Sequence, residues 1–286
     1  MTEAARVAIC VPAYASERFL AEALDSVLAQ TESNWEMVVV DDASLDGSYQ
    51  IAQSYAASDP RIVAIRNPQN LGAAASWAVA VAATTAPFVK LLCSDDAIRA
   101  DCLERQLAVF EADTAGRLGL VAAQRQLIAE DGAVIRKRHG LMGLTRSAAT
   151  IGHRQLVEAM LRTGTNPLGE PSTVMFRRAA LTAAGGFDPQ WRYLIDLKAY
   201  VEIAKRYDIA LIHEPIGVFR VSSTSWSAQL ARSQAAETRR LFRQAADDAG
   251  IGRPLLWRGI LAARALQTIR RVVTVTTRWR SRLGRS

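Results

Sequence analysis

Two pairs of acidic residues end apolar runs in the first half of the chain. Asp41 and Asp42 end the run WEMVVVDD, and Asp95 and Asp96 end the run FVKLLCSDD. If both runs are strands of one sheet, the pairs repel each other unless a positive group lies between them. Carboxylate oxygens suit Mg²⁺ or Mn²⁺, and such ions carry phosphate oxygens. Together the two pairs favour a site for a nucleotide and a divalent cation.

Helix capping is a second interpretation of the same acids. Asp42 or Ser44 could stabilise the start of one predicted helix, and Asp95 or Asp96 the start of another. For each of these residues considered alone, the ligand site and the helix cap both stay open.

The elements that must position these acids are predicted by hydrophobic periodicity. Four apolar runs are typical of buried strands and lie at 7–14, 35–42, 61–67 and 88–96. Amphipathic stretches between them predict helices near 19–28, 47–57, 72–84 and 100–112. This order predicts a parallel sheet with helices on both faces, the Rossmann-like form of an α/β fold. Ligands bind such sheets outside the carboxyl ends of the strands, where the acids stand.

The second half of the chain is predicted to be mixed. We expect a strand pair turned at Asp131 and Gly132, and then further elements. These are helices near 153–163 and 194–206, strands near 172–176, 208–213 and 216–221, and helices to the end. We therefore divide the chain into a domain at 1–225, with halves at about 1–118 and 119–225, and a helical, arginine-rich extension at 226–286.

Several other chemistries lack their motifs. VPAYASERF stands after the first predicted strand in place of G-x-G-x-x-G, and no Walker P-loop is present. The histidines, His139, His153 and His213, have no metal-ligand spacing, and no G-x-S-x-G occurs. Nicotinamide, flavin, zinc hydrolase and serine hydrolase sites are therefore disfavoured.

The basic charge is concentrated at the C-terminal end. The net charge is +7, but residues 249–286 contain nine Arg and no Lys, Asp or Glu, so 26 basic and 28 acidic residues remain elsewhere. The rest of the chain, residues 1–248, therefore lacks the excess positive charge that would neutralise nucleic-acid phosphates. We expect no nucleic-acid partner. At helical spacing from Leu266, aliphatic and Trp side chains face away from most of the arginines. This pattern predicts either a helix on an anionic membrane surface or a helix docked on the body.

Cysteine usage bears on location. The three cysteines, Cys10, Cys93 and Cys102, form no C-x-x-C pair, and an odd number cannot all close internal disulfides. The first residues do not have the pattern of a signal peptide. We expect a cytoplasmic protein, peripheral on the cytoplasmic face of the inner membrane if the last helix binds lipid.

The motifs in their order resemble those of family 2 glycosyltransferases, which have the GT-A fold. The matching pieces are ICVPAY, ALDSVLAQTESNWEMVVVDDASLDGS, NLGAAASW, FVKLLCSDD and GGFD, with Asp196 downstream. The resemblance covers about residues 6 to 226. It implies inverting transfer of a sugar from a nucleotide diphosphosugar with Mg²⁺ or Mn²⁺, and it makes 119–225 the acceptor half.

The resemblance implies a role for each residue of the nucleotide site. Pro12, Ala13 and Tyr14 match the loop around the nucleotide, with Tyr14 beside the base; a core position is the alternative for this Tyr. Asp41 matches the acid that binds the imide N–H of the base, so that Asp42 or Ser44 holds the local turn. Arg66 ends the third predicted strand and is expected at the same nucleotide-sugar site.

The acids of the fourth run match the D-x-D region. Asp95 and Asp96 are expected to bind ribose and the metal that bridges the diphosphate. The sequence departs from the family pattern here, because Cys93 replaces the first acid and Arg220-Val221-Ser222 replaces R-x-H, removing a metal-ligating histidine. The metal would then be held by Asp95, Asp96 and oxygens of the donor.

Asp196 occupies the place of the family's general base. It would take the proton from an acceptor hydroxyl that attacks the anomeric carbon opposite the leaving diphosphate. The alternative is an exposed acid at a helix N-terminus that pairs with Lys198 or Arg192. Three residues match the family's acceptor side: Glu170, Pro171 and Ser172. Two further departures are Ala15 for the usual Asn and Ile195 for the usual Glu.

The sequence thus predicts an inverting glycosyltransferase that builds a cell-surface polysaccharide or glycolipid. A UDP-sugar is the first expected donor and a dTDP-sugar the second; the acceptor is a hydroxyl of a glycan or lipid-linked glycan. The alternatives are a non-catalytic membrane-associated scaffold with the same fold and a sugar-nucleotide nucleotidyltransferase, which lacks its expected phosphate loop here.

Overall fold

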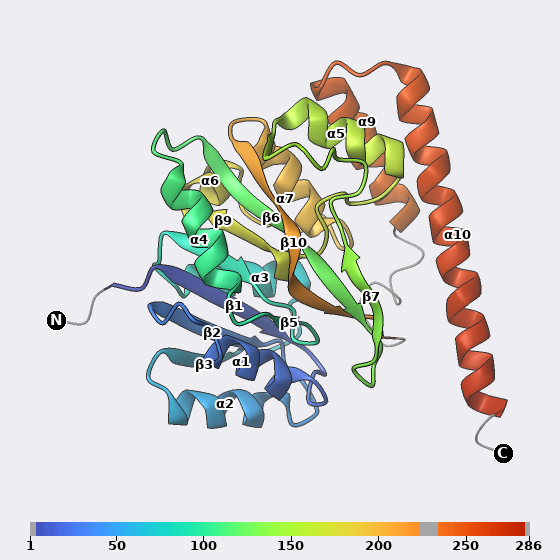
Figure 1. Cartoon of the computed structure of the whole chain (residues 1–286). Helices are drawn as coiled ribbons and strands as arrows, with labels where there is room; N and C mark the ends of the chain where they lie inside the picture. Colours follow the sequence, from blue (N-terminus) through green and yellow to red (C-terminus); the bar gives the residue numbers. More distant parts are fainter. Residues whose placement is uncertain (1–3, 223–233, 284–286) are drawn as a thin grey trace.

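A ten-stranded sheet forms the centre of the molecule. The structure is a computed structural model that describes residues 4–222 and 234–283, the stretch 269–283 as helical backbone only. Figure 1 shows the strands in the order β3-β2-β1-β4-β9-β6-β10-β5, with β7 beside β6 and β8 beside β10. The strands are β1 (Val7–Ala13), β2 (Trp35–Asp41), β3 (Ile62–Arg66), β4 (Phe88–Leu91), β5 (Ala97–Ile98), β6 (Leu118–Ile128), β7 (Val134–His139), β8 (Thr150–Ile151), β9 (Val174–Arg177) and β10 (Asp208–Arg220).

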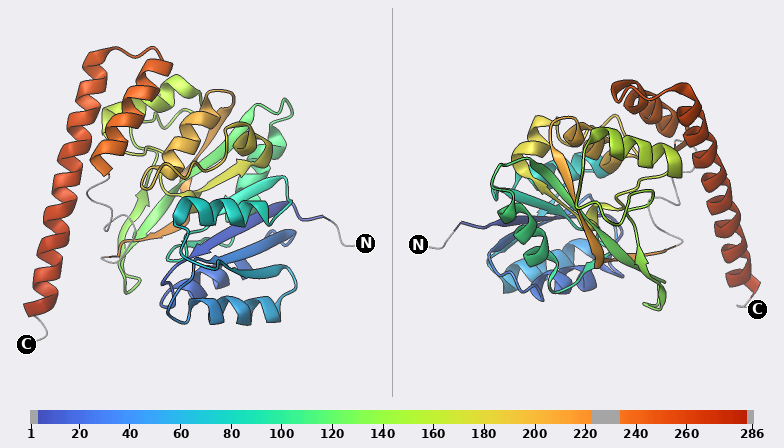
Figure 2. Two further views of the ribbon diagram at one scale, coloured as in Figure 1. Left: turned by 180° about the vertical axis from the view of Figure 1, so that it is seen from behind. Right: turned by 45° about the horizontal axis from the view of Figure 1, so that its top comes forward.

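Helices cover both faces of this sheet (Figures 1 and 2). One face packs against α1, α2 and α4, and the other against α3, α5, α6, α7, α9 and α10. The bounds are α1 (Leu20–Leu28), α2 (Ser48–Ser58), α3 (Ala73–Ala82), α4 (Cys102–Ala112), α5 (His153–Thr163), η1 (Pro171–Thr173), α6 (Arg178–Ala183), α7 (Ile195–Ala204), α9 (Gln234–Asp248) and α10 (Arg253–Leu283).

The first half confirms the predicted parallel sheet. Strands β1, β2, β3 and β4 are parallel neighbours. Both faces are covered, so β1 is buried throughout: Ala8 and Cys10 contribute to one core, and Val7, Ile9 and Val11 to the other. The carboxyl ends of these strands meet at one edge, as the βαβ order requires.

The second half differs from the sequence predictions in three places. The two strands expected at 208–213 and 216–221 are one strand, β10, whose pairing with β6 shifts around Pro215 because proline lacks the N–H needed for a regular ladder. Ser172 lies in η1 and β9 begins at Val174. The helix α6 and the short strand β8 were not predicted, nor was β5 in the first half, because segments this short carry little periodicity.

The C-terminal helices join the core of the body. Phe242 of α9 and Ile260 of α10 are buried in the same cluster as β1 and α7. Glycines permit close packing: a Cβ on Gly259 would lie 2.9 Å from the backbone of Leu161. Thus α9 and the first part of α10 dock on the body, while α10 continues along its side (Figure 1). A boundary near residue 225 stays a prediction.

No helix in residues 4–222 and 234–283 is both long and apolar enough to cross a bilayer.

Candidate active site

The loops after β1, β2 and β4 are hydrogen-bonded to one another. The backbone N–H of Ala15 donates to Ser44 Oγ at 3.1 Å, and the hydroxyls of Ser16 and Ser94 lie 2.6 Å apart. Ser16 therefore links loops, and it does not cap α1, whose N-cap position is Phe19. These contacts bring the Pro12-Ala13-Tyr14 loop, the Asp41 loop and the Asp95 loop to one edge of the sheet.

Asp41 is a buried carboxylate with a free acceptor. Its side chain is 0% exposed, and its Oδ2 accepts from the N–H of Ser44 at 3.2 Å and lies 3.3 Å from Arg66 Nε. Its Oδ1 has no hydrogen-bond partner within the described part of the chain. A buried acceptor without a partner costs about 1–3 kcal/mol, so this oxygen fits a ligand donor such as an imide N–H.

Tyr14 follows Ala13, the residue that pairs with Asp41 across β1 and β2. It follows β1 directly and is 52% exposed, so the alternative core position is wrong. Of the two preceding residues, Ala13 is buried at the end of β1 and Pro12 is partly exposed. An exposed ring at the carboxyl edge is available to stack on a nucleotide base.

Asp42 holds the local turn, as the resemblance implied. Its Oδ1 accepts from Asn67 Nδ2 at 2.7 Å and from the N–H of Leu71 at 2.8 Å, and its Oδ2 from the N–H of Gly72 at 2.9 Å. The capping interpretation is wrong for Asp42, Ser44, Asp95 and Asp96, because the N-cap residues of α2 and α4 are Gly47 and Asp101.

The Asp95-Asp96 turn is tied to two other elements. Asp96 is 2% exposed; its Oδ2 accepts from Ser172 Oγ at 2.6 Å and its Oδ1 from the N–H of Arg220 at 3.1 Å. Ser172 Oγ also accepts from the N–H of Cys93 at 3.0 Å. Burial raises the pKa of both carboxyls, that of Asp96 the further because it also lies beside Asp95.

Arg220 supplies a positive charge beneath this turn. Its side chain is buried, donates from Nε to the Asp95 carbonyl at 3.1 Å, and pairs with Glu22 at 2.5 Å. The face of Phe19 lies 4.4 Å from its guanidinium carbon. Ser222 donates to Glu130 at 3.1 Å, in the position where the family pattern has histidine.

The turn fits a cation that arrives with its substrate. No group of three or more His, Cys, Asp or Glu capable of holding a metal occurs in residues 4–222 and 234–283. Asp95 is partly exposed, whereas both oxygens of Asp96 are engaged by protein donors. Mg²⁺ is commonly held by one or two carboxylates together with substrate phosphates and water. Asp95, with Asp96 behind it, meets that requirement.

Asp196 lies in the first turn of α7 and is partly exposed. Its Oδ2 accepts from Asn166 Nδ2 at 2.9 Å. Burial, together with the neighbouring Glu170 charge, raises the pKa of Asp196 to about 7. The alternative pairing with Lys198 is wrong, since Lys198 Nζ lies 2.6 Å from Glu202. A carboxyl that titrates near 7 is matched to proton transfer at neutral pH.

An ion pair lies beside Asp196. Arg125 Nη2 donates to Glu170 Oε1 at 2.9 Å, and Arg125 Nε pairs with the second oxygen. The Arg125 side chain is 6% exposed and that of Glu170 is 29% exposed. Because Pro171 and Ser172 are buried, Glu170 is the residue of the predicted acceptor-side group that reaches solvent.

Sequence reasoning missed Arg125, Asn166 and the structural role of Arg220. Arg125 had a signal, since it is the one charged residue of the largely apolar run LGLVAAQRQLI. Asn166 had none, because its loop has no periodicity. Both lie far from Asp196 in the sequence and meet it only through the packing of β6, η1 and α7.

A sequence profile of glycosyl transferase family 2 matches residues 8–182. The chain belongs to glycosyltransferase family 2. The family assignment agrees with the geometry, because the matched residues include the Tyr14, Asp41 and Asp95 loops and Glu170.

Relatives within family 2 include proteins of cell-surface glycan synthesis. TuaG of Bacillus subtilis, provisionally described as a teichuronic acid biosynthesis glycosyltransferase, is 37% identical over 101 residues, 35% of this chain and 40% of TuaG. WfgD of Escherichia coli, a UDP-Glc:α-D-GlcNAc-diphosphoundecaprenol β-1,3-glucosyltransferase, is 35% identical over 104 residues, 36% of this chain and 40% of WfgD. The alignments thus span less than half of each relative.

Solved structures confirm the GT-A type of fold. S. aureus TarS 1-349 in complex with UDP-GlcNAc superposes with a TM-score of 0.66 at 20% identity, over 85% of this chain and 66% of that one. The mannosyltransferase PcManGT of Pyrobaculum calidifontis in complex with GDP-Man and Mn²⁺ superposes with a TM-score of 0.62 at 20% identity. The superposition covers 96% of this chain and 75% of that one.

Proposed function

We propose that this family 2 protein is an inverting glycosyltransferase that transfers a sugar from a nucleotide diphosphosugar to a hydroxyl of a glycan or lipid-linked glycan. The observation that carries the proposal is Asp196, a carboxyl whose pKa lies near 7, in the same site as the Asp95-Asp96 turn. The two are connected through Glu170, whose charge acts on both Asp196 and Asp96, and through Ser172, two residues further along the chain, which donates to Asp96.

The donor would lie across the carboxyl edge. The unpartnered Asp41 oxygen, Arg66 and the exposed Tyr14 support a nucleobase with an imide N–H, which uridine and thymidine both have. A UDP-sugar is therefore the first candidate and a dTDP-sugar the second. The complex of TarS with UDP-GlcNAc supports the same donor class.

The diphosphate would lie over the Asp95-Asp96 turn. A Mg²⁺ or Mn²⁺ ion held there would act as a Lewis acid that stabilises the charge accumulating on the leaving diphosphate. Asp95 faces the site, and Asp96 and Arg220 fix the turn beneath it. Burial raises the pKa of both carboxyls, and a bound cation would offset that unfavourable burial of their charge, which supports the proposal.

Asp196 would accept the proton of the acceptor hydroxyl. The oxygen attacks the anomeric carbon from the side opposite the diphosphate, so one displacement inverts the configuration. Asn166 holds one carboxylate oxygen of Asp196. Glu170, fixed by Arg125, keeps the pKa of Asp196 raised, which makes it a stronger base once it is ionised.

The biological role that fits best is synthesis of a cell-surface polysaccharide, as the roles of TuaG and WfgD suggest. A cytoplasmic protein at a membrane face would meet such acceptors.

Asp196→Asn provides the test. The isosteric amide cannot accept the proton, so turnover of the preferred donor should fall by about 10²–10⁴-fold. Nucleotide binding should remain, because Asp196 lies apart from the Asp41 loop. A panel of nucleotide sugars is screened first by hydrolysis, and calorimetry with and without Mn²⁺ then measures binding. Unchanged turnover would show that Asp196 is not the general base. Absence of both turnover and nucleotide binding in the wild type would favour the scaffold alternative.

A further inference from the structure

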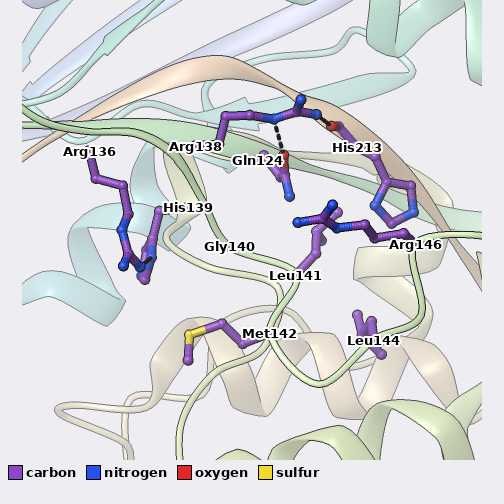
Figure 3. A pocket seen from close by; sticks show the side chains of 10 residues that line it. All are labelled: Gln124, Arg136, Arg138, His139, Gly140, Leu141, Met142, Leu144, Arg146 and His213. Carbon is purple, nitrogen blue, oxygen red and sulfur yellow. Dashed lines mark hydrogen bonds between the residues drawn. The ribbon is translucent and has the colours of Figure 1, made fainter.

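A basic cavity of about 320 Å³ opens in the acceptor half, outside the nucleotide and catalytic residues (Figure 3). Its walls come from β6, β7, the loop after β7 and β10. The basic side chains are three arginines, Arg136, Arg138 and Arg146, and two histidines, His139 and His213. No lining residue is acidic.

The arginines of this cavity lack carboxylate partners. In the described ranges 4–222 and 234–268, no ion pair involves Arg136, Arg138 or Arg146. Arg138 donates to Gln124 Oε1 at 3.2 Å and to the carbonyl of His213. The Arg146 guanidinium points toward Gln124 and Leu141 in Figure 3 and makes no hydrogen bond within those ranges. Most other arginines of the body form ion pairs with acidic residues. The guanidinium groups of Arg136, Arg138 and Arg146 are therefore available to bind an external anion.

The cavity adjoins the catalytic group through two contacts. Gly140 lines it, and a Cβ on Gly140 would lie 2.7 Å from Arg125 Nη1, a buried donor with no partner in the described residues. The N–H of Met142 donates to the carbonyl of Pro167 at 3.1 Å, next to the Asn166 that holds Asp196. The cavity therefore lies on the Asp196 side of the site, away from the Asp41 loop.

The lining selects the class of ligand. Several guanidinium groups around a small cavity match a phosphate, which offers three or more acceptor oxygens and up to two negative charges. Leu141, Met142 and Leu144 add an apolar side, and Met142 is 38% exposed. The volume is enough for one small group and not for a glycan chain.

We propose that this cavity binds a phosphate or diphosphate group of the acceptor, and so holds the acceptor hydroxyl toward Asp196. The proposal rests on the proposed glycosyl transfer and deepens it by naming the acceptor class. A lipid-linked diphosphate and a polyol phosphate share this chemistry.

The test is calorimetric titration of the full chain with two probes, geranyl diphosphate and glycerol 3-phosphate, with UDP at saturation. Arg146→Gln removes a guanidinium that has no hydrogen bond to lose in the described residues. It should raise the Kd of the bound probe by about tenfold, and Arg138→Gln with Arg146→Gln by more. Lys137→Gln is the matched control, because Lys137 lies between two lining residues on β7 but does not line the cavity. It should change Kd by less than about twofold.

Each result of this titration either supports or overturns the proposal. Binding of geranyl diphosphate alone assigns a lipid diphosphate, binding of glycerol 3-phosphate alone assigns a polyol phosphate, and binding of both assigns the phosphate itself. The proposal is overturned if neither probe binds, or if Arg146→Gln and Lys137→Gln behave alike. Donor hydrolysis by the wild type without acceptor tests the proposed function separately, since phosphate binding that depends on Arg146 does not require it.

Discussion

Asp196 and Glu170 form a pair of unlike carboxylates in one pocket. Glu170 forms an ion pair with Arg125, whereas Asp196 has no ion pair in the described residues and accepts a neutral hydrogen bond from Asn166. Asp196, with its pKa raised to about 7, is the group of this pair that we propose exchanges a proton.

The pH dependence of transfer follows from this arrangement. Activity should rise with pH through an acid limb near 7, because Asp196 must be ionised to act as a base. Glu170→Gln removes a neighbouring negative charge and should move that limb to lower pH by about half a unit to one unit. Profiles of kcat against pH for both proteins provide the measurement. An acid limb near 4 in the wild type would contradict the assignment.

The same pKa predicts a pH dependence of stability. The unfolded carboxyl titrates near 4, so the native state binds more protons between pH 4 and 7 and loses stability as pH rises through that range. Asp196→Asn should lack this loss and be more stable than the wild type at pH 8, by on the order of 2 kcal/mol. Urea denaturation at pH 5 and pH 8 measures the difference.

Ala15 has a backbone conformation that alanine rarely adopts. Its φ is 51°, in the left-handed region that Asn tolerates better, and Asn is the usual residue of the family at this position. Ala15→Asn should stabilise the fold by about 1 kcal/mol. Ala57→Asn, an exposed position in the regular helix α2, should be slightly destabilising. Thermal unfolding compares the melting temperatures of the two variants. Equal changes in melting temperature would show that the left-handed φ of Ala15 does not cause the stabilisation.

At the scale of elements, α9 holds the start of the helix that carries Asp196. Glu237 accepts from the N–H groups of Arg192, Tyr193 and Leu194 at 2.9 to 3.2 Å. The sequence placed Glu237 in an extension beyond the catalytic domain. The packing makes it a positioning residue for the catalytic helix.

Glu237→Ala should therefore affect both stability and turnover. The loss of three accepted hydrogen bonds should lower the free energy of unfolding by about 1–2 kcal/mol. It should lower kcat more than it changes KM for the donor, because the Asp41 and Asp95 loops are untouched. Asp247→Ala, at an exposed site on the same helix, is the control. A purely structural role would leave kcat of the folded variant unchanged, and Glu237→Gln should recover part of the loss.

At the scale of the whole molecule, the C-terminal end has two parts, the start of α10 and the arginine-rich stretch beyond residue 268. Leu256, Ile260 and Ala263 of α10 are buried against the body, which confirms docking for this part. Six of the nine arginines of the tail lie beyond residue 268. Membrane binding by that last part stays a prediction.

Two truncations separate these tasks. A chain ending at residue 252 should lose several kcal/mol because buried apolar side chains are removed. A chain ending at residue 268 should keep the melting temperature of the full protein, yet float less with anionic liposomes if the arginines bind them. Equal flotation of the 268-residue and full-length chains would exclude membrane binding by the tail.

The sequence by itself determined the parallel half of the fold and the residues at its carboxyl edge. Those residues follow strongly periodic strands, so local pattern alone places Asp41 and Asp95 at strand ends. The order of the motifs determined the family and located Asp196.

Only the tertiary structure decided how these residues work together. The Arg125–Glu170 pair, the Asn166 contact with Asp196, the cap from Glu237 and the basic cavity each join segments distant in the chain. Their geometry depends on how β6, η1, α7 and α9 pack, and a side chain's neighbours across such packing leave no trace in the spacing of its own segment. Long-range burial and charge pairing, which set the pKa of Asp196, therefore require the folded chain.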